Sequence, residues 1–120
     1  MKQELPKCPI AAAITLVGSK WKIQIIRELL LCEAGARRFG ELKAGIEGVS
    51  DKMLSQSLKE LEEDHLISRH VLDTAPPHAE YALTGMGRGL ACALRALYEW
   101  GLRYKNAYEK LPDEKESNKT

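Results

Sequence analysis

The middle of the chain contains a helical segment whose polar side chains could bind nucleic acid. A spacing of three and four residues places four of them on one helical face: Lys52, Ser55, Gln56 and Lys59. Ammonium, hydroxyl and amide groups of this kind donate hydrogen bonds to base edges and phosphates in the major groove of DNA. Because most solvated helices also have a polar face, the pattern gains meaning only from the elements that position it.

Cys8 is the residue best placed for covalent chemistry. Pro9 follows it, which predicts a helix N-terminus, where free amides and the helix dipole favour a thiolate. Lys7 adds a positive charge beside it. We expect Cys8 to be modified before Cys32 and Cys92, which we assign to apolar helical surroundings. The alternative, a buried structural cap beside a dimerisation helix, stays open.

The polar face belongs to the second helix of a predicted helix-turn-helix. The apolar residues on its inner face, Leu54, Leu58 and Leu61, repeat at helical spacing, with Met53 beside them. Ser50 is a good N-cap for this helix, and Asp51 suits its first turn. A shorter amphipathic helix over residues 39–46 precedes it, joined by the Gly-containing turn 47–49.

A β-hairpin is predicted directly after this helix. The β-branched stretch 66–72 and the stretch 80–84 form its strands, and the loop 73–78 between them contains two prolines. A hairpin in this position is a wing. His65, where the helix ends, would adopt the left-handed conformation, and His78 would lie exposed at the wing tip. The positive charge of an exposed His78 would rise as the pH falls from 8 to 6.

Two further helices precede the helix-turn-helix. The first begins at Pro9 and ends at Gly18, and the second runs from Lys20 to about Cys32 after the N-cap Ser19. Arg37 and Arg38 form a minimal strand that would pair with the hairpin. The predicted fold class is therefore α+β and mostly α: a winged helix-turn-helix with an additional N-terminal helix.

A long C-terminal helix, with Thr84 as its predicted N-cap, carries a heptad pattern, which is typical of a helix that pairs with a partner. The residues of this seam alternate steps of four and three: Leu90, Leu94, Leu97, Gly101, Tyr104 and Tyr108. We expect a homodimer through this helix, with Ile10 and Ile14 of the first helix at the same interface. From residue 112 to 120 the chain is charged, poor in apolar residues and predicted to be a disordered tail.

The composition permits one domain, over residues 1–111 with a core at about 8–104. The chain has 120 residues and a net charge of +1, so its total charge does not indicate nucleic-acid binding. Basic residues nevertheless outnumber acidic ones between Lys20 and Lys43, which predicts a basic face unless the charges are merely scattered. We expect a cytoplasmic protein with reduced thiols, no membrane association, no metal and no cofactor.

Several motifs in one order resemble the HxlR family of bacterial winged-helix regulators, which is related in architecture to the MarR group. They are residues 8–10 (CPI), 18–22 (GSKWK), 38–42 (RFGEL), 50–54 (SDKML), 58–64 (LKELEED), Pro76-Pro77, Glu80-Tyr81 and Leu83-Thr84. The resemblance implies a dimeric DNA-binding transcription regulator. It also implies that the cysteine matching Cys8 senses electrophiles or oxidants in some members.

Three positions depart from the family pattern. Ser57 and His78 stand where basic residues are common, and His65 stands where Gly is common. Fewer basic side chains at the DNA surface would make binding weaker or more sensitive to salt.

The predicted DNA contacts divide by role. Lys52, Ser55 and Gln56 would read base edges, whereas Lys20, Arg38 and Lys59 would bind phosphates, with Ser50 adding a hydroxyl or helix N-terminal contact. Two protomers would bind an inverted-repeat operator.

Two alternatives remain from other classes. The winged helix could serve only as a protein-interaction module, because acidic residues crowd the end of the central helix at Glu60, Glu62, Glu63 and Asp64. An enzyme with Cys8 as nucleophile is disfavoured, because no histidine or second cysteine lies near it in the sequence.

Overall fold

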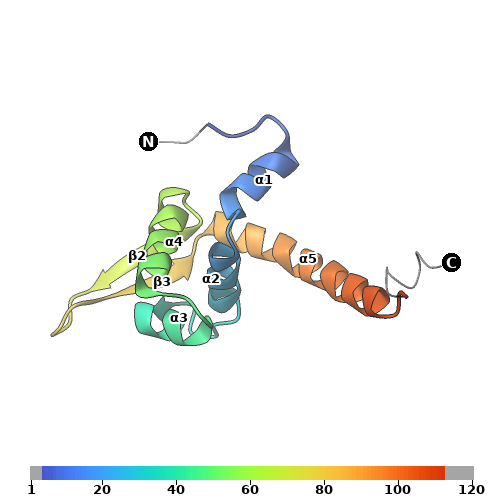
Figure 1. Cartoon of the computed structure of the whole chain (residues 1–120). Helices are drawn as coiled ribbons and strands as arrows, with labels where there is room; N and C mark the ends of the chain where they lie inside the picture. Colours follow the sequence, from blue (N-terminus) through green and yellow to red (C-terminus); the bar gives the residue numbers. More distant parts are fainter. Residues whose placement is uncertain (1–3, 113–120) are drawn as a thin grey trace.

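The computed structural model describes residues 4–112 as five helices and one small sheet (Figure 1). In chain order the elements are α1 (Pro9–Val17), α2 (Lys20–Leu30), β1 (Arg37–Arg38), α3 (Phe39–Gly45), α4 (Asp51–Glu63), β2 (Ile67–Leu72), β3 (His78–Leu83) and α5 (Gly85–Glu109). This order confirms the predicted winged helix-turn-helix and its α+β, mostly α class. Apart from Pro112, the predicted tail lies outside the described residues.

One hydrophobic core joins α2, the helix-turn-helix and the base of the sheet. Its fully buried members come from every one of these elements: Ile25, Ile26, Leu42, Ile46, Leu54, Leu58, Leu61 and Ile67. The predicted inner face of α4 is confirmed at its three leucines, and Met53 beside them is 42% exposed. The core therefore fixes α4 through its inner leucines and leaves its opposite face free.

Local capping explains where α3 and α4 begin. The Ser50 hydroxyl accepts a hydrogen bond from Met53 N–H at 3.1 Å, which confirms it as the N-cap of α4. The Glu41 carboxylate accepts a hydrogen bond from Arg38 N–H at 2.9 Å and so fixes the start of α3. Between the helices, Gly48 has a φ of 82°, a left-handed conformation that glycine adopts without strain.

The sheet has the strand order β1-β3-β2, with both neighbouring pairs antiparallel. Arg37 and Arg38 pair with Tyr81 and Glu80, which confirms the predicted minimal strand. The β2–β3 hairpin forms the wing and extends away from the helices (Figure 1). His65 has a φ of 59°, so its predicted left-handed conformation between α4 and β2 is also confirmed.

The N-terminal part of α5, as far as Leu94, packs against the sheet and α2, whereas the C-terminal part of the helix extends away from the body of the protomer (Figure 1). The Thr84 hydroxyl caps α5 by accepting from Gly87 N–H at 3.0 Å. Gly87 is buried, and a Cβ there would lie 2.0 Å from the carbonyl oxygen of Leu66. The glycine-rich first turn of α5 is helical, and Gly87 permits its close packing on the chain at Leu66.

Helix α1 is the least integrated element. It buries none of its residues, and only Leu16 and Val17 at its end pack against the core. Gly18 ends it as predicted, although with a φ of −61° rather than in the left-handed conformation.

Candidate nucleic-acid interface

The outer face of α4 presents the side chains predicted to contact bases and phosphates to solvent. Lys52, Ser55, Gln56 and Lys59 are all exposed, and the leucines behind them hold the helix on the core. The Ser50 hydroxyl accepts the capping hydrogen bond, which leaves its own hydrogen available to a phosphate. This helix face therefore offers several hydrogen-bond donors, and within residues 4–112 neither Lys52 nor Lys59 forms an ion pair.

Ser57 does not belong to this face. It is 3% exposed and lies among the core leucines of α4, so the inference that a basic residue is missing there from the DNA surface is wrong. A small hydroxyl fits where α4 packs closely, and the spacing of polar residues alone did not separate it from Ser55 and Gln56.

The residues outside α4 that were predicted to contact DNA differ in their exposure. Lys20 and Arg38 are exposed at the N-termini of α2 and α3, and Lys20 Nζ lies 4.4 Å from the centre of the Trp21 ring. His78 is half-buried rather than exposed, because its Nδ1 lies 2.9 Å from the Thr74 hydroxyl at the base of the loop. Its Nε2 is buried and lacks a hydrogen-bond partner within residues 4–112. The prediction of an exposed wing-tip histidine is therefore wrong.

The predicted basic face is smaller than the sequence suggested, since three of its cations are paired. Lys22 pairs with Glu60 of α4 at 3.6 Å, and Arg27 pairs with Glu28 at 3.4 Å. Lys43 pairs with Asp51 across the turn of the helix-turn-helix. The Lys22 and Lys43 pairs each join two helices, and all three pairs reduce the positive charge available to a polyanion. A count of charges in the sequence shows neither effect.

The structure adds basic residues that the sequence analysis missed. Arg69 on β2 lies beside the outer face of α4 and lines a hollow with Ser55 and Lys59. The pairing register of the sheet also places Arg37 opposite Tyr81, in one row with Arg69. The period-two alternation of β2 could have revealed Arg69, because it shares the sheet face of the buried Ile67.

Cys8 lies exposed at the N-cap of α1, as predicted. The backbone N–H groups of Ala11 and then Ile10, at the open end of the helix, lower the pKa of the Cys8 thiol below its ordinary value. Burial within the protomer is excluded, so the structural alternative of a buried cap would require a partner.

The predicted surroundings of the other two cysteines are wrong. Cys92 is exposed on α5. Cys32 lies after the end of α2, half-buried, where its thiol donates a hydrogen bond to the Ala36 carbonyl oxygen at 3.2 Å. The apolar sequence around each cysteine was misleading because α5 extends beyond the core and α2 ends two residues earlier than predicted.

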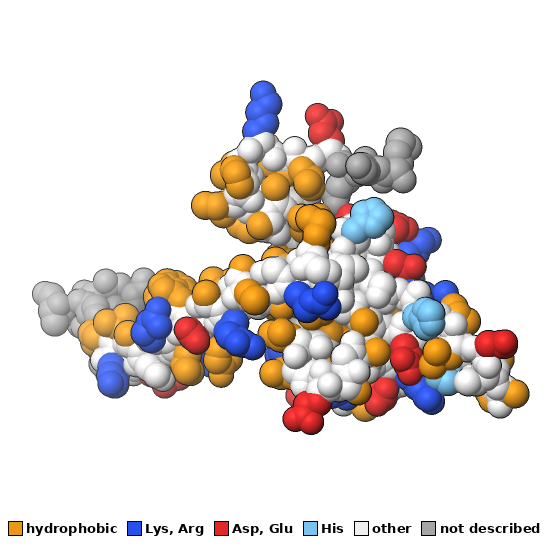
Figure 2. All heavy atoms as spheres, turned by 180° about the vertical axis from the view of Figure 1, so that it is seen from behind, with side chains coloured by type: hydrophobic (Ala, Val, Ile, Leu, Met, Phe, Trp, Pro, Cys, Tyr) orange, Lys and Arg blue, Asp and Glu red, His pale blue; other side chains and the backbone are white. Residues whose placement is uncertain are grey.

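Exposed apolar side chains gather on α1 and along α5 (Figure 2). Of the predicted interface residues, Ile10, Ile14, Leu97, Tyr104 and Tyr108 are all more than half exposed. Leu90, Leu94 and Gly101 are half-buried, and the two leucines pack against the protomer's own core. The seam therefore begins on the body of the protein and continues into solvent. Trp100, Tyr104 and Tyr108 stack along its exposed part, with ring centres 5.3 and 6.0 Å apart.

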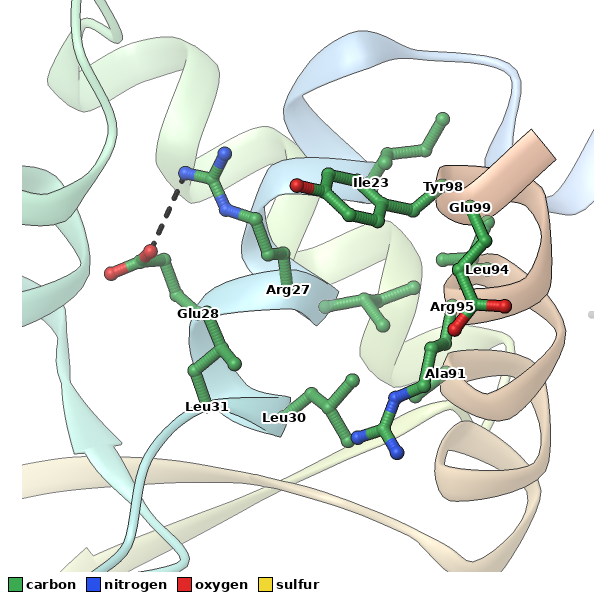
Figure 3. Close-up of a pocket in the computed structure, with 11 residues that line it drawn as sticks. Ile23, Arg27, Glu28, Leu30, Leu31, Ala91, Leu94, Arg95, Tyr98 and Glu99 are labelled. Carbon is green, nitrogen blue, oxygen red and sulfur yellow. Dashed lines mark hydrogen bonds and ion pairs between the residues drawn. The ribbon is translucent and has the colours of Figure 1, made fainter. Parts of the chain in front are cut away.

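A hollow of about 710 Å³ lies between α2 and α5 (Figure 3). Its apolar lining includes Ile23, Leu30 and Leu94, and Tyr98 reaches across from α5 toward Arg27 (Figure 3). Within residues 4–112, no helix is long and apolar enough to cross a membrane, and no cluster of side chains could hold a metal ion.

Comparison with known proteins agrees with this architecture. A sequence model of the HxlR-like helix-turn-helix family matches residues 16–109, so Cys8 lies before the matched segment. The regulatory protein MalR of Fusobacterium mortiferum is 41% identical over 95 residues, which cover 79% of this chain and 88% of MalR.

Two solved structures extend the likeness to the fold. A MarR-family transcriptional regulator from Enterococcus faecalis V583 is 30% identical, with a TM-score of 0.75 over 92% of this chain and all of the other. The redox regulator HypR in its reduced form is also 30% identical, with a TM-score of 0.77 over 87% of this chain and all of HypR. The chain therefore belongs to the HxlR-like helix-turn-helix family of transcriptional regulators.

Proposed function

We propose that this regulator binds double-stranded DNA as a homodimer, with α4 of each protomer in a major groove. The observation that carries the proposal is the exposed donor face of α4, which the core holds rigidly between α3 and the wing. Lys52, Ser55 and Gln56 would face base edges. Lys20, Arg38 and Lys59 would bind phosphates, with Ser50 beside them at the helix N-terminus.

The second protomer would pack on the exposed seam of α5 and on α1. Leu97 and the stacked Tyr104 and Tyr108 would be covered, and Gly101 would permit a close approach of two helices. Ile10 and Ile14 supply an apolar face on α1 that the protomer itself does not cover. Two α4 helices related by a two-fold axis require an inverted-repeat operator with half-sites about one helical turn, or a small multiple, apart.

Modification of Cys8 would switch this regulator. The thiol is exposed, and its lowered pKa increases the thiolate, which is the reactive form. HypR, a structural neighbour, is a redox regulator. In a disulfide with Cys8 of the partner subunit or with a small cellular thiol, two thiols lose two electrons and two protons to the oxidant. The bond would move α1 on the dimer surface and so change the distance between the two α4 helices.

DNase footprinting upstream of the protein's own gene, with and without diamide, tests both parts of the proposal. The unaltered protein should protect an inverted repeat, and diamide should weaken binding by about 5–150-fold, the usual range of coupling between two sites. Cys8→Ser should bind DNA and resist diamide.

The controls separate DNA binding from thiol sensing. Cys92→Ser should remain sensitive to diamide, because Cys92 lies on α5 and not at the N-terminus of α1. Equal loss of binding in the unaltered protein and in Cys8→Ser would contradict sensing by Cys8. An absence of salt-dependent duplex binding by the reduced protein would contradict the DNA-binding function itself.

A further inference from the structure

The hollow between α4 and the wing has a basic lining. It measures about 280 Å³ and is lined by Ser55, Leu58, Lys59 and Glu62 of α4 and by Arg69 and Tyr81 of the sheet. Leu58 is buried and Tyr81 is half-buried, so both belong to its inner side. Polar groups thus surround an apolar base next to the helix that would enter the major groove.

The register of the sheet fixes the direction of Arg69. In an antiparallel pair, residues directly opposite one another point to the same face. Arg37, Tyr81 and Arg69 are opposite one another across the three strands and therefore form one row. Arg69 follows Ile67 by two residues, so it shares the face of a side chain that is buried against the helices. Arg38, by contrast, belongs to the next row, opposite Glu80.

The charges of the hollow favour an anion. Lys59 and Arg69 form no ion pair within the described part of the chain, unlike Lys22, Arg27 and Lys43. Ser55 adds a hydroxyl donor, and Glu62 is the one carboxylate among the lining residues. In the same row as Arg69, the Arg37 Nε is buried and lacks a hydrogen-bond partner within residues 4–112.

We propose that this hollow binds a phosphodiester group of the DNA strand that passes between α4 and the wing. The inference rests on the proposed DNA-binding function and adds Arg69 as a phosphate-binding residue opposite Lys59. A guanidinium group offers paired donors that match two phosphate oxygens, whereas the lysine acts as a point charge. Contacts to phosphate fix the register of the protein on the duplex without reading its sequence. Arg69 should therefore contribute equally on any sequence.

Salt dependence of binding tests this assignment. Binding to a mixed-sequence duplex of about three helical turns is measured by fluorescence anisotropy over a series of KCl concentrations. The slope of log K against log salt is negative, and each lost phosphate contact makes it shallower by about 0.9. The change is therefore about 2 when both protomers are bound. Arg69→Ala should show this change, Arg69→Lys should retain most of the slope, and Glu62→Gln should bind more tightly.

Arg103→Ala is the matched control, because it removes one exposed arginine from the side of α5 opposite the seam. Its slope should equal that of the unaltered protein. If Arg69→Ala has the slope of Arg103→Ala while the unaltered protein binds, the phosphate site is wrong and DNA binding stands. If the unaltered protein shows no salt-dependent binding, both fail. If Arg69→Ala does not fold, the other two variants test the site. A salt slope for Arg69→Lys that is shallower than that of Arg103→Ala would contradict the site, and so would an unchanged affinity in Glu62→Gln.

Discussion

Two neighbouring glycines in the first turns of α5 have opposite roles. At Gly87 a Cβ would lie 2.0 Å from a backbone oxygen of Leu66, whereas at Gly89 nothing lies within 4 Å. Gly87→Ala should therefore destabilise the protein by about 1–3 kcal/mol, because backbone must move to relieve the overlap. Gly89→Ala should stabilise it by up to about 1 kcal/mol, because alanine is the better helix former. Urea unfolding of both variants measures the difference, and equal free energies of unfolding would contradict it.

The thiol of Cys8 should react with a pH dependence set by its helix terminus. The amides of Ala11 and Ile10 lower its pKa, so the thiolate persists to lower pH in the folded protein than in the unfolded chain. At pH 7, iodoacetamide should therefore alkylate Cys8 faster in the native protein than in urea, and the difference should shrink above pH 9. Peptide mass spectrometry follows Cys8 and the exposed Cys92 in one experiment. Equal rates for Cys8 in both states would show that the helix terminus does not activate the thiol.

Individual side chains were predictable wherever local chemistry decides their role. The capping hydroxyls of Ser19, Ser50 and Thr84 and the left-handed His65 follow from short-range rules, and the structure confirms all four. The roles of Ser57 and Gly87 depend on what another segment brings into contact, which no local pattern specifies.

At the scale of elements, the helix-turn-helix is held by charge as well as by its core. Lys22 of α2 lies 3.6 Å from Glu60 of α4, and its side chain is only 12% exposed. The Lys43–Asp51 pair joins the end of α3 to the first turn of α4. The acidic end of α4 was the reason to consider a protein-interaction module. One of its carboxylates, that of Glu60, pairs with Lys22 inside the protomer. Helix and strand periods predicted the elements, but the partners of these charges required the packing of α2 against α4.

The wing shows the same division between period and packing. The β-branched stretch and the prolines predicted a hairpin, and β3 pairs with both β1 and β2. The pairing register of β2 and β3 places Arg69 beside α4, and His78 contacts the Thr74 hydroxyl at the base of the loop. A shift of one residue would exchange the two faces, so the residues on the α4 side of the wing could not be chosen from the hairpin prediction alone.

For the whole molecule, the seam of α5 should determine the oligomeric state. Leu97 is 57% exposed in the middle of the seam, and Leu97→Lys would place two charges in the contact between protomers. We expect this variant to sediment as a monomer and to lose DNA affinity, because a dimer gains from two half-sites. Ala96→Lys, one residue away and off the seam, is the matched control. A monomeric unaltered protein would contradict the proposed dimer.

The poor anchoring of α1 links thiol chemistry to assembly. Isolated helices shorter than about 12–15 residues are marginal in water, and this one has 9 residues, none of them buried. In the proposed dimer, a second copy would supply the surface that keeps α1 helical. The amides that favour the Cys8 thiolate exist as a cluster only while that helix is formed. Sensitivity to oxidants would then be a property of the dimer and would decrease on dilution. A separated protomer would bind its operator poorly, and its Cys8 thiol would react slowly with oxidants.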